Sequence, residues 1–211
     1  MKTHKIVNTV AGENTYLLES QTSLLIIDPG SDWEKIKKRI DHLNKRVLAI
    51  LLTHTHYDHI LSVEAVRKYF QQPPLYVSKQ EASWLQSPKD NLSGLPRHDD
   101  MEDVVVAPAE HLFEPHQTYQ IRDFTFSVVP TPGHSFGSVS FIFREEEVIY
   151  SGDALFKENI GRTDLPTGNA DDLISSIQQE LFTQPDHFTV HPGHGQSTSI
   201  AHEKEANPYF Q

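Results

Sequence analysis

The chain of 211 residues contains no cysteine. This absence excludes disulfides, iron–sulfur clusters, thiolate zinc sites and a cysteine nucleophile. Long apolar runs are also lacking, because stretches such as residues 24–27 and 47–52 are far shorter than the roughly 20 residues that a membrane-spanning helix needs. The N-terminal residues include lysines but no apolar stretch after them, so we expect no secretory signal and no membrane partner. The expected location is the cytoplasm.

Positive charge is scarce as well. Lys and Arg number 18 against 29 Asp and Glu, which gives a formal net charge of −11. An acidic surface repels phosphate backbones, so nucleic acid is not an expected partner. Histidine, by contrast, occurs 13 times. In a chain without cysteine, so many imidazoles direct attention to metal ligation.

The length fits one domain over residues 1–211. Short segments rich in Val, Ile, Leu and Tyr alternate with helical patterns in both halves, which predicts the α/β class, a sheet-rich sandwich with helices outside. Residues 47–52 and 119–129 are predicted strands, and residues 60–70 are a predicted helix. The irregular segment 87–103 is interpreted as a lid or a surface insertion.

Residues 53–59 read Thr-His-Thr-His-Tyr-Asp-His and form a predicted polar loop after an apolar strand. Imidazole nitrogens and carboxylate oxygens suit borderline or hard divalent cations. His54 and His56 are two residues apart on extended chain and therefore project to the same side. Asp58 and His59 follow after the chain turns, which predicts one ligand pair for each of two ions. The alternative is a solvated loop in which Asp58 caps the next helix.

Three later loops carry the same chemistry, each directly after a predicted strand. They contain His134, Asp153 and His194, each preceded by a glycine that lets the backbone turn sharply. Each loop alone is weak evidence, since Gly-Asp turns are common. His191 is a further candidate ligand, but only His194 lies in a Pro-Gly-His-Gly turn, so we expect His191 to be structural.

The order HxHxDH … H … D … H resembles the metallo-β-lactamase fold superfamily over essentially the whole chain. Three further features resemble the short glyoxalase II-like hydrolases, the single-domain branch of the hydroxyacylglutathione hydrolase group. They are Asp-Pro-Gly at residues 28–30, Gly-Asp-Ala-Leu-Phe … Ile-Gly-Arg-Thr-Asp-Leu-Pro at residues 152–166, and Glu … Asn-Pro at residues 203–208. Leu61 and Phe136 depart from the usual Gly and Pro, which predicts an altered pocket shape rather than lost chemistry.

The resemblance implies an αββα sandwich of two mixed β-sheets flanked by helices, and a two-metal site. The implied ligands are His54, His56 and His134 for the first ion; Asp58, His59 and His194 for the second; and Asp153 as a bridge, together with a water or hydroxide. Zinc is the expected metal, with iron or manganese as alternatives, because nitrogen and oxygen ligands admit all three.

The implied reaction is hydrolysis of a small-molecule thioester of the S-acylglutathione type. The metal-bridging hydroxide is the nucleophile, and Asp58 and Asp153 are the catalytic carboxylates. A thiolate, with a parent pKa of about 8.5, leaves without a strong general acid. Arg162 resembles the residue that meets a glutathione carboxylate, although an ion pair with Asp164 would instead make it scaffold. Only 17 residues follow His194, so we expect no added C-terminal helical domain, and the carrier thiol stays open.

Two other functions remain alternatives. Persulfide dioxygenases share the fold and the Gly-Arg-Thr-Asp signature but use one iron, held by the counterparts of His54, His134 and Asp153. A binding scaffold is the non-enzyme alternative, which a complete ligand set disfavours. A β-lactam substrate is disfavoured because neither an export signal nor a cysteine ligand is present. The oligomeric state stays open.

Overall fold

The structure is a computed structural model that describes residues 1–96 and 101–211. Residues 97–100, inside the segment predicted as a lid or insertion, lie outside the described residues. The chain divides into two compact units, Met1–Leu112 and Phe113–Gln211. Each unit is built on its own six-stranded sheet. In the described part of the chain, no helix has the length and apolar character needed to cross a membrane.

The first unit contains a mixed sheet whose strand order follows the chain from β1 to β6. β1, β2 and β3 pair antiparallel, whereas β3, β4 and β5 pair parallel. The strands are β1 (Lys2–Val7), β2 (Asn14–Glu19), β3 (Ser23–Ile27), β4 (Arg46–Leu51), β5 (Leu75–Ser78) and β6 (His111–Phe113), in which the chain passes into the second unit. The helices are α1 (Trp33–Leu43), α2 (Tyr57–Ile60), α3 (Val63–Tyr69) and the 3-10 turn η1 (Ala82–Gln86).

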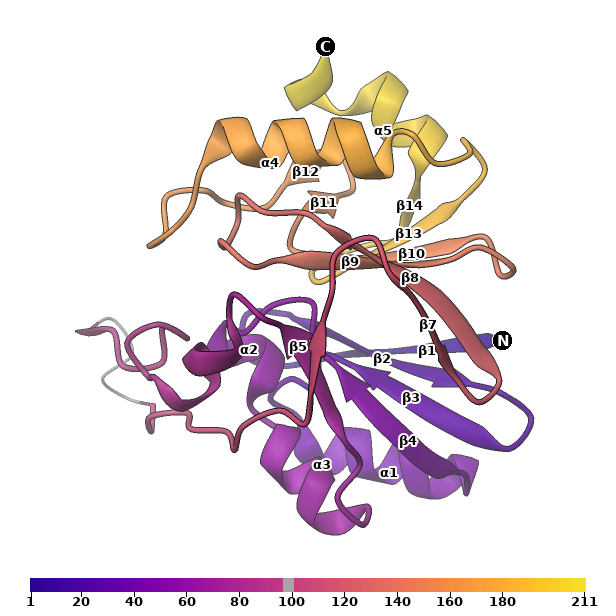
Figure 1. Cartoon of the computed structure of the whole chain (residues 1–211), viewed down its shortest axis with the longest axis vertical. Helices are drawn as coiled ribbons and strands as arrows, with labels where there is room; N and C mark the ends of the chain where they lie inside the picture. The colour runs from indigo at the N-terminus through magenta and orange to yellow at the C-terminus, as the bar shows by residue number, and fades with distance from the viewer. Residues whose placement is uncertain (97–100) are drawn as a thin grey trace. The chain divides into compact units, whose positions relative to one another are not determined.

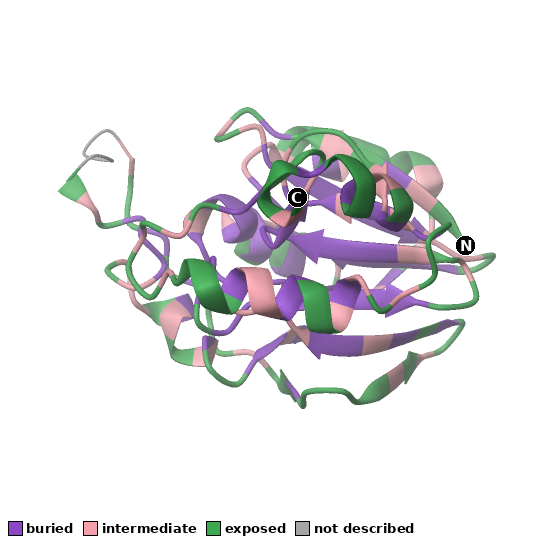
Figure 2. Ribbon diagram, turned by 90° about the horizontal axis from the view of Figure 1, so that it is seen from above, coloured by how far each residue is buried: buried purple, intermediate pink, exposed green. Residues whose placement is uncertain are grey.

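A hydrophobic core joins this sheet to its helices. α1 buries Ile36 and Ile40, and α3 buries Val63 and Val66, in one cluster with sheet residues such as Ile50. α1 and α3 lie against the same face of the sheet (Figure 1). β3 is buried along its whole length, as expected of a strand in the middle of a sheet. Figure 2 shows helices that carry both buried and exposed residues. This core includes residues of β4, the strand that the histidine motif follows.

The second unit is also a mixed sheet, with strand order β14-β13-β10-β9-β8-β7. Among the described strands of this sheet, β10 and β13 pair parallel and the other neighbours pair antiparallel. Its strands are β7 (Thr118–Ile121), β8 (Phe124–Pro130), β9 (Val139–Phe143), β10 (Val148–Gly152), β13 (Thr189–Pro192) and β14 (Thr198–Ser199), with a separate small hairpin of β11 (Leu155–Phe156) and β12 (Asn159–Ile160). The helices are α4 (Ala170–Ser176), which continues as the π-helical turn η3 (Ile177–Leu181), α5 (Ile200–Ala206) and the 3-10 turn η4 (Pro208–Phe210).

The strand directions in this sheet bring three loops to one edge. β8 and β10 are both antiparallel to β9, and β13 is parallel to β10. The carboxyl ends of β8, β10 and β13 therefore meet at the same edge of the sheet. Leu173 and Ile177 pack with Ile142 and Ile149 in the core that α4 and η3 form with the sheet.

Two element predictions were wrong in detail. The helix predicted over residues 60–70 is α3, which begins later, at Val63, and a separate short helix, α2, occupies Tyr57–Ile60, largely inside the predicted loop. The strand predicted over residues 119–129 is a hairpin, because Arg122 adopts a left-handed conformation (φ 52°) and turns the chain between β7 and β8. Each unit is nevertheless a mixed sheet with helices packed on it, as the α/β class predicted.

Candidate metal centre

The histidine motif begins at Thr53, shortly after β4. Asp28, which follows β3, accepts two hydrogen bonds from Thr53. The Thr53 backbone N–H donates to Asp28 Oδ1 at 2.8 Å, and its hydroxyl donates to Asp28 Oδ2 at 2.6 Å. Since the hydroxyl proton is directed to Asp28, the Thr53 oxygen accepts from His54 Nδ1, 3.1 Å away. His54 therefore carries its proton on Nδ1. In this tautomer, Nε2 is the nitrogen that can bind a metal ion.

Thr55 is held in the same way by a different carboxylate. Its backbone N–H and its hydroxyl both donate to Glu81 Oε2, at 2.7 and 2.9 Å. The two histidines beside Thr55 are buried, and their ring centroids lie 4.7 Å apart. The structure therefore brings His54 and His56 to one side, as their spacing predicts.

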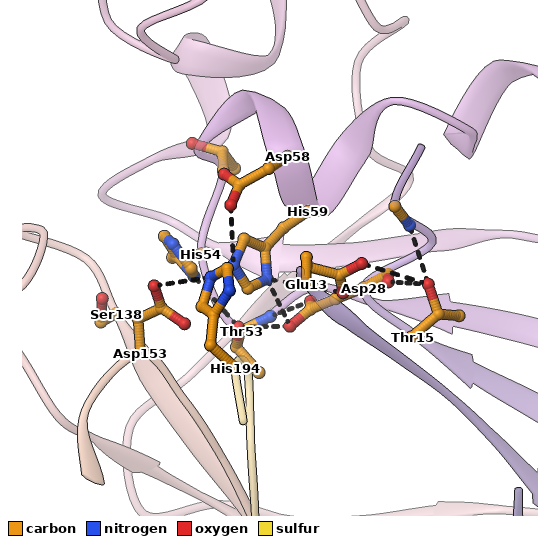
Figure 3. Close-up of polar contacts among 12 residues, drawn as sticks. Glu13, Thr15, Asp28, Thr53, His54, Asp58, His59, Ser138, Asp153 and His194 are labelled. Carbon is orange, nitrogen blue, oxygen red and sulfur yellow. Dashed lines mark hydrogen bonds and ion pairs between the residues drawn. The ribbon is translucent and has the colours of Figure 1, made fainter. Parts of the chain in front are cut away.

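His59 lies in the single helical turn α2, and its ring centroid is 4.1 Å from that of His54. Its Nδ1 lies 3.1 Å from Asp28 Oδ2, so one carboxylate serves both Thr53 and His59 (Figure 3). Asp58 Oδ2 lies 3.8 Å from His59 Nε2. The Asp28 carboxylate at His59 Nδ1 orients the ring and raises the basicity of Nε2 as a metal ligand. All four candidate ligands of the first unit are thus adjacent and buried.

A second buried carboxylate, Glu13, lies behind Asp28. Its Oε1 is 4.0 Å from His59 Nδ1, and its Oε2 accepts from Asn8 Nδ2 at 2.6 Å. A Cβ atom on Gly30 would lie 1.9 Å from Glu13 Oε2, so glycine is required at that position. The sequence analysis noted Asp-Pro-Gly at residues 28–30 only as a family feature. It missed Asp28, Glu13 and Glu81 as groups that support the motif.

The other three candidate ligands lie in the second unit, on the loops after β8, β10 and β13. Asp153 Oδ2 lies 3.5 Å from His134 Nε2 and 3.3 Å from His194 Nε2. His134 and Asp153 are buried, whereas His194 is partly exposed and its ring meets Phe156 at 5.9 Å. One carboxylate oxygen therefore faces both imidazoles that are candidate ligands in this unit.

Glycines allow the close approach of these loops. A Cβ atom on Gly161 would lie 1.8 Å from the carbonyl oxygen of Asp153 and 3.2 Å from His134 Cβ. Gly133 adopts φ +128° and packs against Leu173 of α4, where an added Cβ would lie 2.3 Å from the backbone nitrogen. Both positions therefore exclude a side chain and hold the ligand loops against neighbouring backbone.

Arg162 contributes through its main chain and its side chain separately. Its carbonyl oxygen accepts from His134 Nδ1 at 2.8 Å, which leaves His134 Nε2 toward Asp153. Its guanidinium makes a bidentate pair with Asp164, Nε to Oδ1 and Nη2 to Oδ2, both at 2.7 Å. The two side chains are 55% and 69% exposed, so this pair lies in solvent-accessible surroundings.

Two other residues singled out in the sequence are placed by the structure. His191 Nδ1 lies 2.8 Å from Ser197 Oγ and its ring packs near Tyr150, at 5.2 Å between centroids. The structural role of His191 stays a prediction. Phe136, two residues after His134, is 62% exposed, and its backbone N–H donates to Thr167 Oγ1 at 3.3 Å.

The donor chemistry of both units suits a divalent metal. Imidazole and carboxylate groups are the only side-chain types among the candidate ligands, which favours zinc, iron or manganese over soft-metal chemistry. His54, His59 and His134 each have Nδ1 directed to an oxygen of the protein, which orients Nε2 as the ligating atom. The residues present therefore fit a metal centre.

The family model described as the metallo-β-lactamase superfamily matches residues 8–197. A probable metallo-hydrolase of Streptococcus pyogenes serotype M6 is 57% identical over 210 residues, covering 100% of this chain and 90% of the relative. The hydroxyacylglutathione hydrolase GloC of Haemophilus influenzae is 31% identical over 194 residues, covering 91% of this chain and 89% of the relative.

Two solved structures resemble the whole chain. The BLEG-1 B3 metallo-β-lactamase is 38% identical with a TM-score of 0.94, and the match covers 100% of both chains. The di-iron-bound form of TTHA1623 is 29% identical with a TM-score of 0.83, and the match covers 98% of this chain and 99% of the other.

Proposed function

Because the chain belongs to the metallo-β-lactamase superfamily, we propose that it hydrolyses thioesters with the aid of two divalent ions. The family confirms the predicted fold class, mixed sheets flanked by helices in the α/β class. Together with the probable metallo-hydrolase relative, it also makes the chain a metal-dependent hydrolase. The substrate, the number of ions and the ligand set are the parts that we propose.

The observation that carries the proposal is the position of the Asp153 carboxylate. In one unit, a single oxygen of Asp153 lies within 3.5 Å of both His134 Nε2 and His194 Nε2. We assign these two histidines to different ions, so the oxygen between them is suited to bridge the ions. The proposed ligands are His54, His56 and His134 for the first ion, Asp58, His59 and His194 for the second, and Asp153 for both. TTHA1623, crystallised in a di-iron-bound form, supports the count of two.

The surrounding residues prepare these ligands for their role. Asp28, Thr53 and the Arg162 carbonyl hold the outer nitrogens of His59, His54 and His134. Asp58 and Asp153 bring the negative charge that offsets the charge of the ions. Two divalent ions held by these residues would lower the pKa of a shared water toward about 7, which would supply hydroxide at neutral pH. The nucleophile therefore needs no separate general base.

A thioester is the substrate class that matches the absence of an obvious general acid in the sequence. Its thiolate has a parent pKa of about 8.5 and leaves unprotonated far more easily than an amine. The similarity to GloC supports an S-acylglutathione substrate in particular. We propose zinc as the metal, with iron or manganese as alternatives, and a small-molecule thioester as the ligand, without nucleic acid or membrane partners. Arg162 is the proposed contact for an anionic part of the substrate.

The test is hydrolysis of S-lactoylglutathione by purified protein under anaerobic conditions, with release of thiol and acid as the readout. We expect steady hydrolysis without oxygen, and we expect His59→Ala to remove most of kcat/KM because it strips a ligand of the second ion. His191→Ala is the matched control, since its imidazole bonds to Ser197 instead. It should retain nearly full activity.

Two other results would replace this function. Oxygen consumption with glutathione persulfide, one iron per chain and little thioesterase activity would identify a mononuclear dioxygenase, which should tolerate His59→Ala. Turnover of a β-lactam with no turnover of thioesters would instead follow the similarity to BLEG-1. The thioesterase, dioxygenase and β-lactamase assays all use the same protein preparation, so the three activities can be compared directly.

A further inference from the structure

Glu81 is a fully buried carboxylate on the chain between β5 and η1. An ionised carboxylate in the interior is unfavourable unless hydrogen-bond donors compensate for the lost water. Two such donors come from one residue, because both the N–H and the hydroxyl of Thr55 are directed to Glu81 Oε2. Thr55 lies between His54 and His56, so this buried carboxylate holds the centre of the motif.

The same pair of hydrogen bonds occurs two residues earlier in the motif, at Thr53. Asp28 accepts from the N–H and the hydroxyl of Thr53, as Glu81 does from Thr55. Two buried carboxylates from different parts of the chain thus hold alternate threonines of the Thr-His-Thr-His segment. Asp28 also contacts His59 directly, whereas Glu81 accepts both bonds of Thr55, the residue between His54 and His56. Glu81 is therefore the carboxylate placed nearest the centre of the His54–His56 pair.

We propose that Glu81 is a positioning residue for the first ion. By fixing the Thr55 backbone, it holds His54 and His56 in the orientation in which both bind the same ion. Asp28 contacts His59 and also holds Thr53 beside His54, so it supports proposed ligands of both ions. This inference rests on the proposed ligand assignment. It adds that Glu81 acts on the affinity for the first ion through His54 and His56.

The experiment measures Co(II) binding to the metal-free full-length chain by visible absorption and by competition with a chelator. Asp58→Ala serves as the background, because it removes a ligand of the second ion and leaves the first-ion ligands intact. In this background we expect Glu81→Ala to weaken Co(II) binding about 10- to 100-fold, the usual effect of losing a group that orients a metal ligand. The cobalt spectrum should also shift, because the ring orientations change.

Two variants separate positioning from simple folding effects. Glu81→Gln keeps an oxygen that accepts both bonds from Thr55, so it should restore most of the affinity. Glu64→Ala is the matched control, because Glu64 Oε1 likewise accepts a backbone N–H, that of Ala107, at 2.7 Å but away from the motif. It should leave Co(II) affinity and spectrum unchanged. If Glu81→Ala does not fold, Thr55→Val tests the same contact. It removes only the hydrogen bond from the Thr55 hydroxyl to Glu81 and should weaken Co(II) binding by a smaller factor.

The outcomes separate this inference from the function on which it rests. Wild-type affinity and spectrum in Glu81→Ala, or in Thr55→Val where the former does not fold, overturn the role of Glu81 while two-metal hydrolysis stands. Equal weakening by Glu81→Ala in a His56→Ala background, where the first ion is already impaired, overturns its selectivity. A wild-type chain that binds no Co(II) overturns both the metal-dependent function and this inference.

Discussion

His134 donates its Nδ1–H to the main-chain carbonyl of Arg162, with the two atoms 2.8 Å apart. The segment Gly-Arg-Thr-Asp at residues 161–164 therefore orients the candidate ligand His134 through its backbone, independently of the Arg162 side chain. Gly161 permits this bond because its missing side chain leaves room for the Asp153 carbonyl. The proposed ligands His134 and Asp153 are thus held by the same short segment.

The first prediction concerns Gly161→Ala. The added methyl would meet the Asp153 carbonyl oxygen at 1.8 Å, so the backbone must shift. We expect the free energy of unfolding to fall by about 1–3 kcal/mol, the usual cost of forcing extra atoms into packed structure. Bound metal should fall as well, because His134 loses its carbonyl partner. Urea denaturation and elemental analysis measure the two effects.

Gly94→Ala is the control for this substitution, because its nearest contact is only the Pro88 side chain at 3.1 Å. It should leave metal content unchanged and destabilise the chain less than Gly161→Ala does. Equal metal content in both variants would contradict the role assigned to the Gly161–Arg162 segment.

The second prediction concerns the Arg162 side chain, which Asp164 holds in a bidentate pair. If Arg162 binds an anionic substrate, Arg162→Ala should raise KM for a glutathione thioester about 10- to 100-fold, since a hydrogen bond to a charged group contributes roughly 1.5–3 kcal/mol. A neutral thioester should be nearly unaffected. Steady-state kinetics on both substrates measure the difference.

Asp164→Asn sharpens this comparison. It weakens the competing pair without removing the guanidinium, so KM for the anionic thioester should fall. A loss of the same size on both substrates in Arg162→Ala would instead mean that the Arg162 side chain serves as scaffold.

The sequence predicted the candidate ligands because their types and positions are local features. His54 and His56 have the spacing of a shared face, and His134, Asp153 and His194 each follow a strand and a glycine. The supporting carboxylates could not be identified in this way. Glu13 and Glu81 look like surface acids in the sequence, and their burial depends on partners that only the folded sheet brings near.

Element boundaries failed for the same physical reason. The helix α2 starts at Tyr57, whose backbone N–H donates to the carbonyl of Asn91, 34 residues later in the chain. The side chain of Asn91 is itself bonded to the carbonyls of Trp84 and Val104. These contacts are non-local, so no pattern in residues 53–59 reveals them. The turn at Arg122 lacks a glycine or asparagine at its left-handed position, which removed the usual turn signal.

The third prediction concerns metal content. Asp58→Ala removes a proposed ligand of the second ion alone, so stoichiometry should fall from two toward one while the fold is retained. Asp153→Ala removes the proposed bridge and should reduce both ions. Elemental analysis of metal-loaded protein measures the counts, and circular dichroism checks the fold. A similar, minor loss of metal in both variants would contradict the ligand assignment.

The fourth prediction concerns Glu19, which is remote in sequence from the metal ligands. Hydrogen bonds from Lys45 and then from His4 lower the pKa of Glu19 to about 2 from its usual 4.5. Arg39 Nη2 donates to His4 Nδ1 at 2.8 Å, which directs His4 Nε2 to Glu19 Oε2 at 2.7 Å, and Lys45 Nζ lies 2.6 Å from Glu19 Oε1. Because the folded-state pKa is depressed, the stabilisation by Glu19 is complete above about pH 4.5 and is lost as the pH falls toward 2.

Comparison of wild type with Glu19→Gln isolates this contribution, because glutamine resembles the protonated acid in shape. The free energy of unfolding, measured in urea, should be higher for wild type at pH 6, and the difference should shrink steadily between pH 4.5 and pH 2. Added salt should reduce the difference at pH 6, since the Lys45 and Glu19 side chains are partly exposed. A difference that stays constant from pH 6 to pH 2 would show that the ionised form of Glu19 does not stabilise the fold.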